Sequence, residues 1–181
     1  MKNPRIYESY PLWIVILATV LTLVVYIAGA YIMFRLSLIT GILYVVYLVL
    51  LERYFFKEGC TCCYYYGKLC AFGKGVIAAI FFERGDPEKF CKRELGFKDF
   101  IPQILVVTIP LIVAIALLIS RGFNLLTLIA MIYPVLSWFV INPILYGKLA
   151  CIHCRQGDIC CPALKFFSKE KGNNKDEKRT N

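Results

Sequence analysis

Four stretches of the sequence are long, apolar and almost free of charge, and they limit what the chain can fold into. They cover residues 12–34, 36–56, 100–119 and 125–146, and Glu52 and Arg53 are the charged residues inside them. The hydrocarbon core of a bilayer is ~30 Å thick, and a helix of ~20 apolar residues crosses it. The sequence therefore predicts an all-α polytopic membrane protein, a bundle of four transmembrane helices built of two hairpins.

Composition supports a membrane protein over a soluble one. Hydrophobic residues make up 59% of the 181 residues and charged residues 18%, against roughly 25% charged residues in an average soluble domain. The first two stretches are separated only by Arg35. A single helix through both would be about 60 Å long, twice the thickness of the bilayer core. We therefore expect the chain to turn back near Arg35.

The N-terminus has one alternative interpretation. Ala28, Gly29 and Ala30 form a small-residue pattern that resembles the cleavage site of a signal peptide. The apolar run before them is long, however, and more apolar sequence follows. A retained first helix is the expected outcome.

Positive charge is divided unequally between the two ends of the predicted bundle. Of the 21 lysines and arginines, Arg35 and Arg121 alone lie in the connections at one end. Cytosolic loops of membrane proteins carry an excess of lysine and arginine. We therefore expect a multi-pass protein of the cell membrane with both termini in the cytosol.

The same charge distribution bears on partners. The net charge of +9 lies beside apolar spans, where membrane topology accounts for it, so nucleic acid is not an expected partner. The lipid bilayer is the expected partner. A protein partner or a second copy of the chain stays open.

We expect residues 1–164 to form a single membrane domain. Its cytosolic face carries two cysteine-rich segments, residues 57–99 and 147–164, and the basic tail of residues 165–181 is expected to be disordered. Within the first segment, residues 71–82 are mostly apolar but too short to span, which is typical of an interfacial or packed helix.

A short internal repeat is also suggested. Residues 66–71 read YGKLCA and residues 146–151 read YGKLAC. Each half of the chain would then be a helical hairpin followed by a segment that carries cysteines, as in membrane proteins with parallel repeats.

All nine cysteines fall in the two predicted cytosolic segments. The cytosol keeps thiols reduced, so metal ligation or redox chemistry is more expected there than stable disulfides. Two C-x-x-C pairs form the main candidate site, because two such pairs can supply four sulfur ligands to one ion. The predicted metal ligands are Cys60, Cys63, Cys151 and Cys154.

The other five cysteines are enough to suggest a second site. Zinc is the favoured metal, and an iron–sulfur cluster is its close rival, because the chain has vicinal cysteine pairs and a Cys-Pro ending similar to ferredoxin-type motifs. Inert or reversibly acylated cysteines stay open as well. The candidates of the second tier are Cys62, Cys70, Cys91, Cys160 and Cys161.

A thiol-based redox role is the alternative to a metal site. Cys151 and Cys154 have the spacing of a redox dithiol, with His153 between them, and an imidazolium lowers the pKa of a nearby thiol. Four spans with C-x-x-C pairs resemble the quinone-linked disulfide oxidoreductases of the DsbB and vitamin K epoxide reductase kind. That resemblance implies a membrane thiol–disulfide or quinone-linked oxidoreductase that uses Cys151 and Cys154, although those proteins keep their cysteines on the oxidising face.

Several other functions find no support in the sequence. No acid pair, Ser/His/Asp set or metalloprotease motif is visible, and His153 is expected beside the metal site instead of as a ligand. We also expect no buried charge within a span, which disfavours ion pumps and proton transporters. Whether the chain is an enzyme is left open between three roles: a metal-stabilised scaffold or adaptor, an electron carrier and a thiol oxidoreductase.

Overall fold

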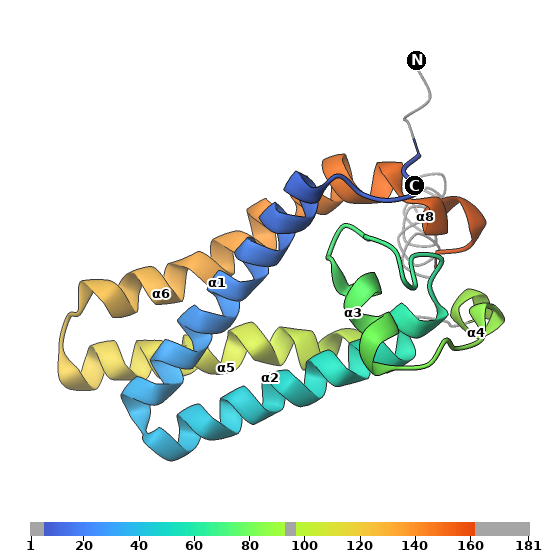
Figure 1. The fold of residues 1–181 in the computed structure, drawn as a ribbon. Helices are drawn as coiled ribbons and strands as arrows, with labels where there is room; N and C mark the ends of the chain where they lie inside the picture. The colour runs from blue at the N-terminus through green and yellow to red at the C-terminus, as the bar shows by residue number, and fades with distance from the viewer. Residues whose placement is uncertain (1–5, 93–96, 162–181) are drawn as a thin grey trace, which may run out of the picture.

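The computed structural model describes residues 6–92 and 97–161, and the part of the chain that it describes is helical and forms no strand (Figure 1). Four helices are long and apolar enough to cross a membrane. The expectation of an all-α protein with four helices of spanning length is confirmed. The predicted tail, residues 165–181, lies outside the described residues. The four helical stretches are Leu12–Leu36, Leu38–Cys62, Lys98–Arg121 and Leu125–His153.

The first turn of the chain lies at Ser37, two residues beyond the predicted position. Helix α1 (Leu12–Leu36) ends there and α2 (Leu38–Glu58) begins, because Ser37 has an extended backbone with φ −160° and ψ 152°. The Ser37 side chain accepts a hydrogen bond from the backbone N–H of Ile39 at 3.3 Å. Serine in this position satisfies one of the free N–H groups at the start of a helix. The cap therefore fixes where the second span begins.

Helix α5 (Phe97–Arg121) contains Pro110, which has no N–H to donate to the carbonyl of Val106. The hydroxyl of Tyr44, in α2, donates to that carbonyl at 2.8 Å. Gly29 of α1 faces the Tyr44 ring so closely that a side chain there would collide with the hydroxyl. The freed carbonyl is thus satisfied by a neighbouring helix, as the absence of water in a bilayer requires.

The last span is irregular. Helix α6 (Leu125–Leu136) is followed by a π-helical stretch, Ser137–Ile141, by the short α7 (Asn142–Ile144) and by a second π-helical stretch, Leu145–Ala150. Prolines at 134 and 143 lie within it, and prolines and π-type insertions both interrupt the regular helical hydrogen-bond ladder. The irregular helix continues without a break to Ala150, so it places Cys151 directly at the end of the bundle.

Helix α1 is the central helix of the bundle and packs against α2, α5 and α6. One core cluster joins Ile32 of α1 to Ala114, Leu117 and Ala130 of the other helices. Large apolar side chains on the outer faces are exposed, as expected of helices in contact with lipid. Examples are Ile39 at 69%, Phe139 at 73% and Ile119 at 81% exposure.

Both cysteine-rich segments gather at one end of the bundle, beside the start of α1 (Figure 1). We call this region the cysteine end and define it as residues 6–11, 59–92 and 151–161. Besides loops it contains five short helices. They are η1 (Cys60–Cys62), α3 (Lys74–Phe81), α4 (Pro87–Lys92), η4 (Cys151–His153) and α8 (Arg155–Ile159).

The hydrogen bond from Tyr44 to Val106 predicts a coupling between two substitutions. Replacing Tyr44→Phe leaves a buried carbonyl unsatisfied and should lower the free energy of unfolding by about 1–3 kcal/mol. In a Pro110→Ala background the cost should shrink, because the alanine N–H can donate to the same carbonyl. Unfolding in mixed micelles measures all four proteins of this cycle. An equal cost in both backgrounds would contradict the assignment.

Candidate cysteine centre

The two C-x-x-C pairs have the same local geometry. Each forms a 3-10 turn at the end of a spanning helix, η1 for Cys60–Cys63 and η4 for Cys151–Cys154. In each turn the N–H of the second cysteine donates to the carbonyl of the first, at 3.4 Å and 3.3 Å. The residues before the turns also match, with φ −113° and ψ −63° at Gly59 and φ −103° and ψ −65° at Ala150.

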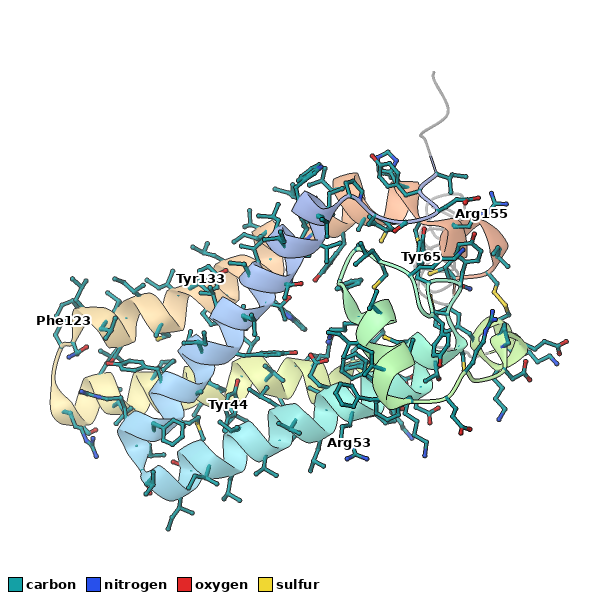
Figure 2. The ribbon with its side chains drawn as sticks, viewed as in Figure 1. Tyr44, Arg53, Tyr65, Phe123, Tyr133 and Arg155 are labelled. Atoms are coloured by element: carbon teal, nitrogen blue, oxygen red, sulfur yellow. A yellow bond between two sulfur atoms is a disulfide. The ribbon has the colours of Figure 1, made fainter. Side chains whose placement is uncertain are left out.

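The two turns are bonded to each other through the residues that follow them. The N–H of Tyr64 donates to Oε1 of Gln156 at 2.7 Å. The N–H of Arg155 donates to the Tyr65 hydroxyl at 2.9 Å (Figure 2). The central and C-terminal segments, which are about ninety residues apart in sequence, are therefore in direct contact in the structure.

The N-terminal residues 6–11 bridge the two segments. The N–H of Tyr7 donates to the carbonyl of His153 at 3.0 Å, and the N–H of Tyr10 donates to the carbonyl of Leu69 at 2.9 Å. The Tyr10 hydroxyl reaches the carbonyl of Ala150 at 2.6 Å. The sequence did not predict this bridge, and the two tyrosines just before an apolar span are its only sequence signal.

Cysteines from both segments pack on one aromatic core. Its buried members are Tyr10, Ile14, Val15, Tyr65, Ala71 and Ala150. The partly buried thiols of Cys63 and Cys70 from the central segment and of Cys154 from the C-terminal segment lie against it. One cysteine of each predicted metal-binding pair therefore contacts the same cluster.

Burial controls the ionisation of these thiols. It raises the pKa of the Cys63 thiol to about 11, and an ionised Cys154 nearby would raise it further, while a hydrogen bond from the N–H of Tyr65 acts in the opposite direction. Burial likewise raises the pKa of Cys154, opposed by backbone N–H groups of Gly157 and Gln156. Each second cysteine of a turn thus faces backbone donors that can stabilise a thiolate once its charge is offset.

No metal-binding group is formed within residues 6–92 and 97–161: no three His, Cys, Asp or Glu side chains are placed to hold one ion. The structure brings the turns that carry Cys60, Cys63, Cys151 and Cys154 into contact. It does not arrange their four sulfurs around one point.

The second-tier cysteines occupy different positions, and Cys70 packs on the aromatic core described above. Cys62 is buried beside Thr61, with its sulfur 3.6 Å from the threonine hydroxyl. Cys91 and Cys160 form a disulfide, with their Cα atoms 5.3 Å apart (Figure 2). The sequence favours reduced thiols over disulfides here, and the disulfide corrects that expectation. Its physical basis is that the fold brings Cys91 of α4 within bonding distance of Cys160, the residue after α8.

A charged pair that the sequence analysis missed lies beside the centre. Lys74, at the start of α3, contacts both carboxylate oxygens of Glu52 in α2, at 2.8 Å and 2.7 Å. The hydroxyl of Tyr26 in α1 donates to the same carboxylate at 2.6 Å. Glu52 lies within the second span and is partly buried, with 21% of its side chain exposed. The sequence signal for this ion pair is the carboxylate of Glu52 inside an apolar stretch.

The raised thiol pKa predicts how the metal-free protein responds to alkali. An unfolded thiol ionises near ~8.5, whereas the Cys63 thiol ionises at about 11 in the fold. The unfolded chain therefore loses its proton first, and stability that is present below pH ~8.5 is lost as the pH rises toward 11. Chelator-treated Cys63→Ser should show a smaller fall in melting temperature over this range. An identical fall would contradict the burial of this thiol.

The likeness to quinone-linked oxidoreductases extends no further than span count and C-x-x-C spacing. Compared with known proteins, the chain matches no family model, no curated protein and no solved structure.

Proposed function

We propose that this chain is an integral membrane protein with a cysteine-ligated metal centre at the cytosolic end of its helical bundle. Zinc is the first expectation and an iron–sulfur cluster the second. One observation carries the proposal: two C-x-x-C turns of matching conformation end two spanning helices and are hydrogen-bonded to each other through the residues that follow them. The proposed ligands are Cys60, Cys63, Cys151 and Cys154.

The electrostatics of the centre are compatible with a metal ion. Cysteine binds zinc as a thiolate, and binding releases the thiol proton. Burial keeps Cys63 and Cys154 protonated in the absence of a positive charge. A divalent ion supplies that charge, and the backbone N–H groups that already face the two sulfurs would then hydrogen-bond to thiolates.

A metal in this position would have a structural effect. It would join the central and C-terminal segments at the N-terminal end of α1, where hydrogen bonds and residues 6–11 already hold them. Structural zinc sites contribute folding energy directly. A scaffold or adaptor role follows for zinc, whereas an iron–sulfur cluster would give an electron carrier.

Metal analysis of protein purified without oxygen tests the proposal. Wild-type protein should contain zinc or iron, and Cys63→Ser or Cys154→Ser should lose most of it because each removes one thiolate of four. Cys62→Ser is the matched control, since its side chain lies beside Thr61 and is not a proposed ligand. Equal loss from the control would refute the ligand set, and wild-type protein without either metal would refute the centre.

The second candidate is a thiol–disulfide or quinone-linked oxidoreductase that uses Cys151 and Cys154. The observation in its favour is exposure: among the seven free cysteines, Cys151 alone is exposed, and accessible thiols are the ones that can react with an oxidant. Metal-free protein with a reversibly oxidised Cys151–Cys154 pair would support this candidate over the metal centre.

The proposed orientation makes a separate prediction. Both ends of the chain and the cysteine end should lie in the cytosol, because 19 of the 21 basic residues are on that side. Reporter fusions after Asn181 and beside Arg121 should report opposite sides of the membrane. An external C-terminus would reverse the topology and place the cysteines on the oxidising face.

A further inference from the structure

Helix α4 lies on the surface of the cysteine end and is joined to it by the Cys91–Cys160 disulfide, which links positions 69 residues apart. None of its residues is buried, and only Phe90 and Cys91 are partly buried. Its ion pair, between Lys92 and Glu88, is internal to the helix and highly exposed, so it contributes little to docking. The disulfide is therefore the strongest described link between α4 and the C-terminal segment.

The position of this disulfide is unusual for the proposed topology. Disulfides on the reducing side of a membrane are mostly transient, catalytic or redox-sensing, apart from those of some thermophiles. Both cysteines are only partly buried, so a reductant can reach the bond. These two facts distinguish it from a disulfide that is locked in a core.

We propose that Cys91–Cys160 is a redox-active disulfide that a cytosolic dithiol protein opens, releasing α4 from the cysteine end. A thiolate of the reductant attacks one sulfur, the S–S bond breaks and a mixed disulfide forms. The second thiol of the reductant then displaces the remaining cysteine. Two electrons and two protons end on Cys91 and Cys160 as two thiols, and the reductant leaves as a disulfide.

The surroundings of Cys160 indicate which sulfur leaves first. Gln156 is buried, and its Nε2 donates to the carbonyl of Cys160 at 2.8 Å and lies 3.3 Å from its sulfur. The other end of the amide accepts the N–H of Tyr64, which fixes its orientation. An N–H group aimed at a sulfur stabilises the thiolate, and a more stable thiolate is the better leaving group. Gln156 is therefore placed to stabilise the Cys160 thiolate when a reductant attacks Cys91.

Release of α4 would act on the first cysteine turn. The N–H of Gly85, just before α4, donates to the carbonyl of Thr61 at 3.1 Å. Gly85 also covers Cys62, since a Cβ at this glycine would lie 2.6 Å from the Cys62 sulfur. Cys62 is 8% exposed in this arrangement. Opening the disulfide removes the covalent restraint on this cover and leaves it held by the weaker hydrogen bond from Gly85 to Thr61, so the Cys62 thiol should become more accessible.

Peptide mapping of the full-length protein in native membranes, alkylated before lysis, tests the disulfide. Trypsin should yield residues 90–92 linked to residues 156–165 in the oxidised protein. A dithiol such as dithiothreitol should remove the link and raise the alkylation rate of Cys62 roughly tenfold, as local opening exposes it. Absence of the linked peptide, even after mild oxidation, would overturn the proposal.

Two variants separate this switch from the metal centre. Cys91→Ser should show rapid Cys62 alkylation without any reductant and should keep its zinc or iron. Cys70→Ser, the matched control, should keep the linked peptide and the slow rate. If Cys62 reacts at the same rate in oxidised, reduced and Cys91→Ser protein, α4 is not a redox-controlled cover. Metal content is measured separately from Cys62 alkylation, so this result would not bear on the metal centre. The two proposals can therefore fail independently.

Discussion

Backbone groups in the hydrocarbon core of a bilayer have no water to bond with, and the arrangement of the helices depends on this constraint. Tyrosine hydroxyls supply donors between helices: Tyr44 reaches the carbonyl of Val106 that Pro110 leaves free, and Tyr47 reaches the carbonyl of Pro102 at 2.7 Å. These bonds fix α2 against α5 at two successive levels. A fixed α2 determines where its end, and therefore the Cys60–Cys63 turn, is placed.

The same constraint explains why the central segment folds back onto the bundle. A carboxylate within a span needs a partner, because an unpaired charge there is costly. Lys74 provides that partner for Glu52, and its neighbour Gly73 approaches α1 so closely that a Cβ would lie 2.9 Å from Val15. The ion pair thus anchors the start of α3 between the first two spans. This anchoring holds the loop that carries Cys63 and Cys70 beside the end of the last span.

The spans could be predicted from sequence because their signal is local: a run of apolar residues is either long enough to cross the bilayer core or too short to do so. The first turn lies two residues from its predicted position. The length of the apolar run requires a reversal near Arg35, and the capping side chain of Ser37 fixes the residue at which the second helix begins. The site was less predictable. C-x-x-C spacing predicts a turn, but the contacts from Tyr7 to His153 and from Tyr64 to Gln156 join positions that only the folded bundle brings together. The Cys91–Cys160 disulfide was missed for the same reason, and because the compartment argued against it.

The internal repeat shows how a match in letters differs from a match in conformation. Residues 66–71 and 146–151 share most of their letters, yet the first set lies in turns and most of the second set is π-helical. Gly67 has φ +75°, in the left-handed region that favours glycine, whereas Gly147 is helical. The structural equivalence lies elsewhere, between the turns that begin at Cys60 and Cys151 and directly follow spanning helices. In each case a 3-10 turn directly after a spanning helix carries two cysteines three residues apart. Because the two turns are hydrogen-bonded to each other through the residues that follow them, cysteines from two separate spans lie in one region of the fold.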